Sequence, residues 1–179
     1  MKTFIIGTDN TKKSVYDISN RLVGLNNDLD ICRSFAVSKS ENEEEEIGQY
    51  AYFLEEEEVI IAHKNDALIY LSFYDKAVEG ITIDEFMNSD IIPIKHEHFN
   101  DIADPFLEDK VLLVLIDSKN NSDTKKKDQV EFNLIYERSD SMNLPLLYFY
   151  DDEEDIVDIV YEFMIGDDET REKILDENK

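Results

Sequence analysis

The residues from Lys2 to Ser14, KTFIIGTDNTKKS, restrict the fold of this chain more than any other stretch. A short apolar run at 4–6 meets Gly7, and polar residues occupy 8–14. Apolar side chains then recur at intervals of three and four residues, at Val15, Ile18, Leu22 and Leu25. This order predicts a buried strand, a polar turn and an amphipathic helix with one apolar face toward a sheet.

The polar turn matches the phosphate-cradling signature G-x-x-x-x-G-K-[ST] except at one position. In such a loop the backbone N–H groups surround the phosphates, the lysine reaches the outer phosphates and the hydroxyl residue holds Mg²⁺. Lys12 stands where the signature has its second glycine, and if that position requires a positive φ, the substitution costs about 1–2 kcal/mol. The candidate residues for a nucleotide or phosphate are Gly7, Asp9, Lys12, Lys13 and Ser14, with Ser14 as the candidate Mg²⁺ ligand.

The rest of the chain alternates between strand-like and helix-like segments. The clearest buried strand is KVLLVLID at 110–117, because its aliphatic content is nearly continuous. Thr82 is predicted to begin a short helix with Glu85 as its capping-box partner. Further strands are predicted at 29–37, 59–62, 67–74, 90–94 and 144–150, and further helices at 130–138 and 156–164. This alternation predicts a three-layer α/β fold, in which helices flank a mostly parallel sheet and the segment 29–37 completes a βαβ unit.

Length and composition favour one domain. The chain has 179 residues and 42% hydrophobic content, which suits a single core. We assign residues 1–166 to this domain and 167–179 to an acidic C-terminal tail that frays. The single cysteine, Cys32, agrees with a reducing compartment. No apolar run reaches the roughly 18–20 residues of a membrane span and no signal peptide opens the chain, so we expect neither secretion nor membrane insertion.

The charge of the chain limits its partners. The formal net charge is −25, from 43 acidic and 18 basic residues. Nucleic acids and anionic membrane surfaces are polyanions that would repel such a protein, so direct binding to either is not expected. The sequence makes no prediction of the oligomeric state.

FIIGTDNTKKS resembles the opening of thymidylate-kinase-like and deoxynucleoside-kinase-like P-loop proteins, which often read G-x-D-x-x-G-K-[ST]. The later order is similar to that family: KVLLVLID, a polar lid-like segment at 118–128, a helix and LPLLYFY. The middle, HKNDALIYLSFY followed by EGITIDEFMNSDIIPIKHEHFNDI, resembles P-loop proteins of large DNA viruses. The resemblance implies a P-loop NTPase-like fold with ATP and Mg²⁺ as ligands.

The chain departs from that family where catalysis requires charge. Related kinases need an acid–arginine pair after the third strand and lid arginines that stabilise the transferred phosphoryl group. In this chain His63, Lys64 and Asp66 stand where the acid–arginine pair is expected, and the basic residues of 118–128 are all lysines. Of the four arginines, at 21, 33, 138 and 171, Arg138 alone falls near the expected lid. We therefore expect a pseudo-kinase without a cofactor, acting through protein contacts as a viral accessory or virion-associated protein in the host cytoplasm or virion.

Two alternatives stay open. A divergent active nucleoside or nucleotide kinase would use Lys13 on the phosphates of ATP, Ser14 on Mg²⁺, and Asp117 or Asp66 as a catalytic helper. Asp117 ends the best strand, where α/β folds collect functional residues. The net charge also suggests an acidic DNA mimic, or another interaction protein, that occupies a nucleic-acid-binding protein.

Two histidines, His96 and His98, could share one strand face. A metal site needs a third ligand, and the other histidine in the chain is His63. We interpret these histidines as surface residues.

Overall fold

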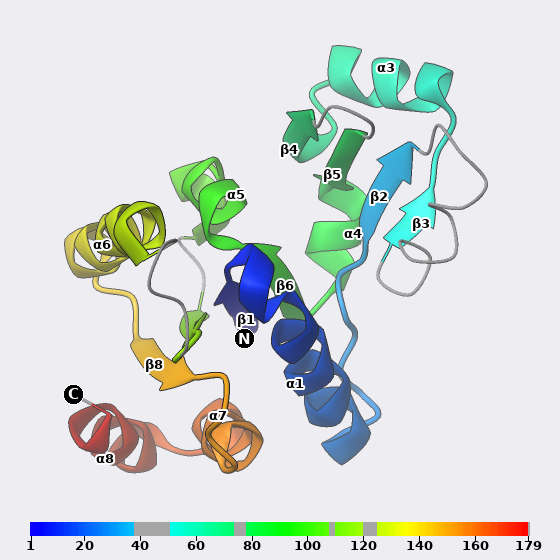
Figure 1. The fold of residues 1–179 in the computed structure, drawn as a ribbon. Helices are drawn as coiled ribbons and strands as arrows, with labels where there is room; N and C mark the ends of the chain where they lie inside the picture. The colour runs from blue at the N-terminus through cyan, green and yellow to red at the C-terminus, as the bar shows by residue number, and fades with distance from the viewer. Residues whose placement is uncertain (38–50, 74–77, 108–109, 120–124, 179) are drawn as a thin grey trace. The chain divides into compact units, whose positions relative to one another are not determined.

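The computed structural model describes residues 1–37, 51–73, 78–107, 110–119 and 125–178 (Figure 1). The chain divides into two compact units: unit 1 comprises Met1–Ile31 and Asp90–Lys179, and unit 2 comprises Cys32–Ser89. The single domain predicted over 1–166 stays a prediction, because compactness does not decide whether parts fold independently. Among the described residues, no helix has the length and apolarity that crossing a membrane requires.

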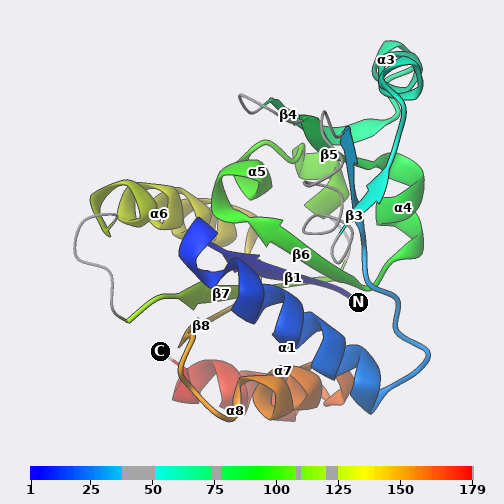
Figure 2. The same ribbon diagram turned by 45° about the vertical axis from the view of Figure 1, so that its right-hand side comes forward.

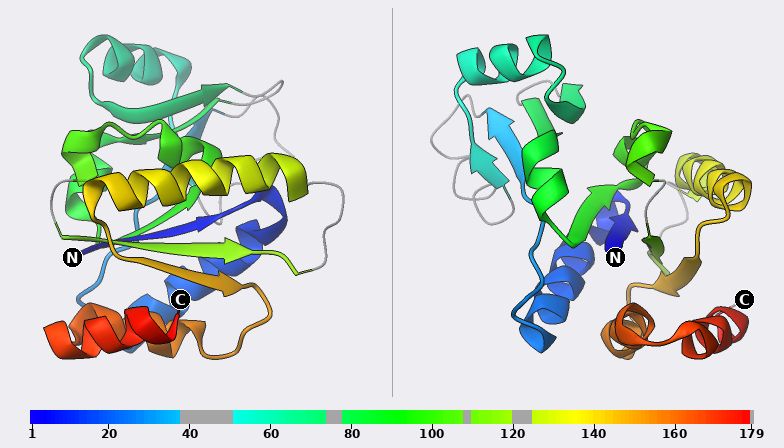
Figure 3. Two further views of the ribbon diagram at one scale, coloured as in Figure 1. Left: turned by 90° about the vertical axis from the view of Figure 1, so that its left-hand side faces the viewer. Right: turned by 180° about the vertical axis from the view of Figure 1, so that it is seen from behind.

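Unit 1 is built on a parallel sheet. Within the described residues its strand order is β6-β1-β7-β8, and every pairing is parallel. Figure 3 (left) shows β1, β7 and β8 running side by side in one direction. The strands are β1 (Lys2–Gly7), β6 (Ile91–Lys95), β7 (Val111–Asp117) and β8 (Leu146–Tyr150). The predicted strands at 110–117 and 144–150 are confirmed, and the proline-containing run at 90–94 forms the edge strand β6.

Helices cover both faces of this sheet (Figures 2 and 3). One face packs against α1 (Lys12–Leu25), α7 (Ile156–Ile165) and α8 (Asp168–Glu177). The other packs against α5 (His96–Asn100) and α6 (Lys125–Met142), with the short helix η2 (Asp104–Leu107) between them in the chain. The predicted three-layer α/β fold, with helices flanking a mostly parallel sheet, is confirmed for unit 1.

Alternating side chains of β1 explain why the strand needs cover on both sides. Ile5 joins the core that includes Val15 and Leu22 of α1. Its neighbour Phe4 faces the opposite layer, where its ring meets Phe99 of α5 edge to face at 5.3 Å. A strand buried on both faces reads as a continuous apolar run, which is why the sequence revealed the central strands.

Unit 2 has its own sheet, in the order β3-β2-β5-β4. Its strands are β2 (Ser34–Val37), β3 (Ala51–Phe53), β4 (Leu68–Phe73) and β5 (Val78–Thr82). The β2–β3 pairing is parallel, whereas β2–β5 and β4–β5 are antiparallel. The prediction that 29–37 completes a βαβ unit with β1 is wrong for residues 34–37, because β2 pairs in the sheet of unit 2. Within 29–37, Ile31 forms an isolated parallel bridge with Ile91 of β6.

The residues 59–62, predicted as a strand, belong to helix α3 (Glu56–Lys64). The helix begins with a reciprocal capping box, in which Glu55 N–H donates to Glu58 Oε2 at 2.9 Å. Its first turn is acidic and its last turn carries His63 and Lys64, an arrangement that suits the helix dipole. A four-residue apolar run is compatible with a strand or a helix. The acidic residues before it and the basic residues after it indicate a helix.

Helix α4 (Ile83–Asn88) confirms the predicted cap, since Glu85 N–H donates to Thr82 Oγ1 at 3.2 Å. The prediction that the acidic tail frays is wrong, because residues 168–177 form α8. Asp167 caps this helix by accepting Thr170 N–H at 2.9 Å, and Ile174 joins the core. The acidic first turn of α8 is a favourable helix start rather than a sign of disorder.

Candidate functional site

The segment after β1 is wound into a helical turn. Thr8 caps the short helix η1 (Asp9–Thr11), and α1 follows directly at Lys12. Lys12 has φ −50° and ψ −46°, ordinary right-handed helical values. The expected cost of a non-glycine residue at this position therefore does not arise, because the backbone there needs no positive φ.

Three N–H groups of this turn are engaged within it. Thr8 N–H donates to Thr11 Oγ1 at 2.8 Å, and Asn10 N–H donates to Thr8 Oγ1 at 3.2 Å. Thr11 N–H donates to the Thr8 carbonyl at 3.2 Å. The Thr11 hydroxyl is fully buried and also donates to the carbonyl of Ile116 in β7, at 3.2 Å. Thr11 thus holds the turn closed against the neighbouring strand.

Gly7 has a structural explanation in this closed turn. A Cβ added there would lie 2.4 Å from Thr11 Oγ1 and 2.5 Å from Val15 Cγ2. Only a residue without a side chain lets the helix start approach the end of β1 this closely. The glycine of the signature is therefore needed here whether or not a phosphate binds.

The engaged N–H groups bear on whether this turn could hold a phosphate. A phosphate cradle needs N–H groups that converge on the anion, whereas those of Thr8, Asn10 and Thr11 are bonded inside the turn. Lys13 is exposed, and Lys12 and Ser14 are partly exposed at the start of α1. The side chain of Asp9 lies outside the described ones. The assignment of Lys12, Lys13 and Ser14 as nucleotide and Mg²⁺ ligands stays a prediction.

Asp117 lies at the carboxyl edge of the sheet, next in sequence to Ile116, which pairs with Gly7. Both of its carboxylate oxygens are occupied: Tyr148 Oη donates to one at 2.6 Å and Ser118 N–H to the other at 2.7 Å. The Tyr148 ring meets Tyr150 edge to face at 5.4 Å. The sequence placed Asp117 at this edge but gave no sign of its tyrosine partner.

Burial and the adjacent carboxylate of Asp117 raise the pKa of Tyr148 well above its ordinary value of 10.0. The unfolded chain loses this proton at about pH 10 while the folded protein keeps it, so stability falls as the pH rises through that value. We expect the Tyr148→Phe variant to lose less stability than the parent between about pH 8 and pH 11, measured by urea unfolding. Tyr52 and Tyr136 also have raised pKa values, but both residues are present in the parent and in the variant. Equal losses in the two proteins would contradict the assignment.

Asp66, the other candidate helper, lies in unit 2, two residues after the end of α3. Its φ of 52° is left-handed and its N–H donates to the His63 carbonyl at 3.2 Å. Aspartate tolerates this conformation better than most residues, so Asp66 has a sufficient role as the residue that ends a helix turn. Its catalytic role stays a prediction.

Arg138, the arginine expected near the lid, is engaged in hydrogen bonds that hold the fold together. Its guanidinium donates to the carbonyls of Phe99, at 3.1 Å, and Ile102, and to the Asp104 carboxylate at 2.6 Å. Arg171 likewise donates to carbonyls at the end of α7. Of the predicted lid, residues 120–124 lie outside the described ones, and α6 begins at 125.

The interpretation of His96 and His98 as surface residues is wrong. Both are buried on the short helix α5 rather than on a strand, and the His96 ring packs on Phe132 at 5.6 Å. His63 belongs to unit 2. Among the described residues, no group of three or more histidine, cysteine, aspartate or glutamate side chains could hold a metal ion.

Thr8 and Thr11 shape the turn but were not among the residues predicted for the site. They form a reciprocal cap, T-x-x-T, of the kind that starts a helix. This signal was present, but it lay inside a motif whose spacing favoured a loop.

Comparison with known proteins identifies the fold. No protein-family model matches the sequence, and no curated protein matches it. Solved structures do match: the crystal structure of guanylate kinase from Anaplasma phagocytophilum superposes with a TM-score of 0.53 at 12% sequence identity, over 97% of this chain and 85% of that chain. At this identity the likeness establishes the fold alone. The chain thus has a P-loop nucleotide-kinase-like α/β fold, with helices flanking a mostly parallel central sheet.

Proposed function

We propose that this chain is a catalytically degraded nucleotide-kinase-like protein, which transfers no phosphate and acts through contacts with other proteins. The observation that carries the proposal is the closed turn after β1. Thr11 is fully buried there, and its hydroxyl binds both Thr8 N–H and the Ile116 carbonyl. A nucleotide would have to break these hydrogen bonds before the backbone could reach its phosphates.

The arginines give a second line of support. Phosphoryl transfer needs positive charge on the transferred group, and a bidentate arginine supplies it better than lysine. Arg138 and Arg171 are engaged with backbone carbonyls, as described above. Arg21 is exposed on α1 and Arg33 is exposed in unit 2.

The proposal includes a virus-encoded accessory or virion-associated role. Its support is the resemblance of the segments HKNDALIYLSFY and EGITIDEFMNSDIIPIKHEHFNDI to P-loop proteins of large DNA viruses. The richness of the chain in Asn, Asp, Lys, Ile and Tyr, which is typical of an AT-rich genome, agrees with it.

Thermal unfolding with ATP and MgCl₂ tests the loss of nucleotide binding. A ligand at about 100 times its Kd stabilises the native state by about 2.7 kcal/mol. For a chain of this size, that would raise Tm by roughly 5–10 °C. We expect no rise beyond that produced by sodium sulfate with MgCl₂ at equal ionic strength.

The Lys13→Ala variant distinguishes this proposal from the alternative that the chain is an active kinase. The observation in favour of that alternative is the nucleotide-kinase-like fold. Lys13 is exposed, so the variant should fold and melt like the parent. A rise in Tm with ATP that Lys13→Ala abolishes, or transfer of labelled phosphate from ATP to any nucleoside or nucleotide, would overturn the proposal.

A further inference from the structure

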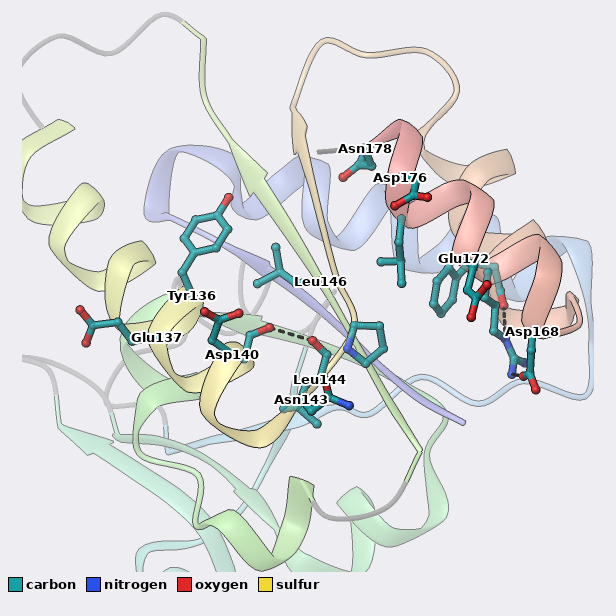
Figure 4. Close-up of a pocket in the computed structure, with 15 residues that line it drawn as sticks. Tyr136, Glu137, Asp140, Asn143, Leu144, Leu146, Asp168, Glu172, Asp176 and Asn178 are labelled. Atoms are coloured by element: carbon teal, nitrogen blue, oxygen red, sulfur yellow. Dashed lines mark hydrogen bonds and ion pairs between the residues drawn. The ribbon is translucent and has the colours of Figure 1, made fainter.

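Unit 1 contains an open groove of about 860 Å³ beside the edge strand β8. One side is formed by the second half of α6 and the other by α8, with Leu144, Pro145 and Leu146 at the start of β8 between them. Figure 4 shows Glu137 and Asp140 on the α6 side, Glu172 and Asp176 on the α8 side, and Leu146 between the two groups. The predicted P-loop lies at the opposite, carboxyl end of the strands and contributes no lining residue.

Among the described residues, no strand pairs with the outer edge of β8, which borders the groove. Leu113 N–H donates to the Pro145 carbonyl at 2.9 Å and Asp151 N–H donates to the Asp117 carbonyl at 2.8 Å, so the odd-numbered residues of this segment face β7. The even-numbered residues, Leu146, Tyr148 and Tyr150, therefore direct their backbone groups away from the sheet. Such an edge is a template for an additional strand.

Side chains already satisfy two donors of this edge. Tyr150 N–H donates to Glu153 Oε1 at 2.7 Å, outside the part of β8 that lines the groove. Tyr148 N–H donates to Asn178 Oδ1 at 2.7 Å, where the carbonyl of an added strand would lie. Asn178 follows the end of α8 and lines the groove. The amide oxygen thus satisfies an edge donor that would otherwise need water or a partner backbone.

The charge of the groove selects the chemistry of its occupant. Its lining includes five acidic residues and one basic residue, Arg171. The Arg171 guanidinium is engaged with the carbonyls of Phe163 and Met164 and lies 3.7 Å from Asp168. The acidic residues lie on helices that cover opposite faces of the sheet, so an added strand would meet negative charge on both of its faces. The five are Glu137, Asp140, Asp168, Glu172 and Asp176.

We infer that this groove binds an extended, basic peptide segment of a partner protein, which adds to β8 at Leu146 and Tyr148 by displacing Asn178. Backbone hydrogen bonds would supply the pairing, and lysine or arginine on both faces would supply the complementarity. A second copy of the chain is the less suitable occupant, because two acidic grooves would repel one another. The inference concerns a site other than the predicted P-loop and does not depend on whether that loop binds nucleotides.

A fluorescent hexapeptide of sequence KVKKVK tests the inference, because it carries lysine on both faces when extended. Binding is followed by fluorescence anisotropy at about 0.15 M salt, where long-range attraction between exposed charges is largely screened. We expect saturable binding with a Kd below about 1 mM. A peptide in which glutamate replaces lysine should not bind.

Alternate N-methylation of the same peptide tests strand addition with the protein unchanged. In one of the two possible registers the methyl groups remove the N–H donors that face β8, and binding should be lost in that register. Asn178→Ala removes the side chain that competes with the peptide for Tyr148 N–H. Binding should tighten by roughly fivefold, which corresponds to the net contribution of about one hydrogen bond.

Matched charge variants locate the site. The triple variant Glu137→Gln, Asp140→Asn and Glu172→Gln removes three exposed groove charges and should weaken binding by roughly five- to tenfold. The control variant removes three exposed charges elsewhere in unit 1, by Asp17→Asn, Asp28→Asn and Asp101→Asn.

Three results would overturn the inference. They are no saturable binding, equal weakening by the groove and control variants, and undiminished binding of both N-methylated peptides. Sedimentation that shows self-association, abolished by the peptide, would assign the edge to a second copy of the chain instead.

Discussion

Replacing Arg138 with alanine is expected to lower the free energy of unfolding by about 3 kcal/mol. The Arg138 side chain is 15% exposed, and its guanidinium joins α6 to the segment that follows β6. It donates to the carbonyls of Phe99 and Ile102 and lies over the Phe99 ring at 5.5 Å. Removing it leaves partly buried carbonyls without this donor and removes the packing of the side-chain stem.

Thermal and urea unfolding measure this effect, and variants of the same contact resolve its origin. The expected loss corresponds to a fall in Tm of roughly 6–12 °C. Asp104 is 69% exposed, so Asp104→Asn should cost less than about 1 kcal/mol. Arg138→Lys keeps the charge but not the planar fork and should fall between the two. If Arg138→Ala were no more harmful than Asp104→Asn, the carbonyl contacts would contribute little and Arg138 would again be available to a ligand.

Elements whose burial shows in the residue pattern could be predicted. The segments around β1, β7 and β8 are apolar because helices cover both faces of the sheet, and α1 and α7 each carry one apolar stripe. The positions of Gly7 and Asp117 at the carboxyl ends of adjacent strands followed from these elements. Local patterns sufficed because the spacing of apolar residues within each element shows which of its faces are buried.

Features that depend on pairing between distant segments could not be predicted. The strand β2 pairs with β3 and β5 rather than with β1, and nothing within four residues specifies a partner. The contact of Tyr148 with Asp117 joins two strands separated by α6. The closed turn is similar, since Thr11 is fixed by the carbonyl of Ile116, which lies 105 residues further along the chain. The signature predicted a loop from its spacing, whereas this long-range bond and the Thr8 cap favour a helical turn.

A pair of glycine variants, one at the end of β1 and one in α1, tests the closed turn directly. Gly7→Ala should cost about 3 kcal/mol, because its Cβ would overlap Thr11 Oγ1 and Val15 Cγ2. Neither neighbour can withdraw cheaply, since the Thr11 hydroxyl is held by Thr8 and Ile116 and Val15 is in the core. Gly24→Ala, on an exposed part of α1 with no atom within 4 Å of the added Cβ, should instead stabilise the protein by about 0.5–1 kcal/mol.

The opposite signs of these two effects distinguish steric overlap at Gly7 from a general effect of replacing a glycine of this protein with alanine. Urea unfolding of both variants and of the parent gives the comparison, with equal m values required for a two-state interpretation. Val15→Ala in the Gly7→Ala background removes one of the two overlaps, so the double variant should be more stable than the sum of the single losses predicts. If Gly7→Ala were tolerated as well as Gly24→Ala, Thr11 would not lie against Gly7. The turn would then be open, and the proposal that this chain transfers no phosphate would lose the observation on which it rests.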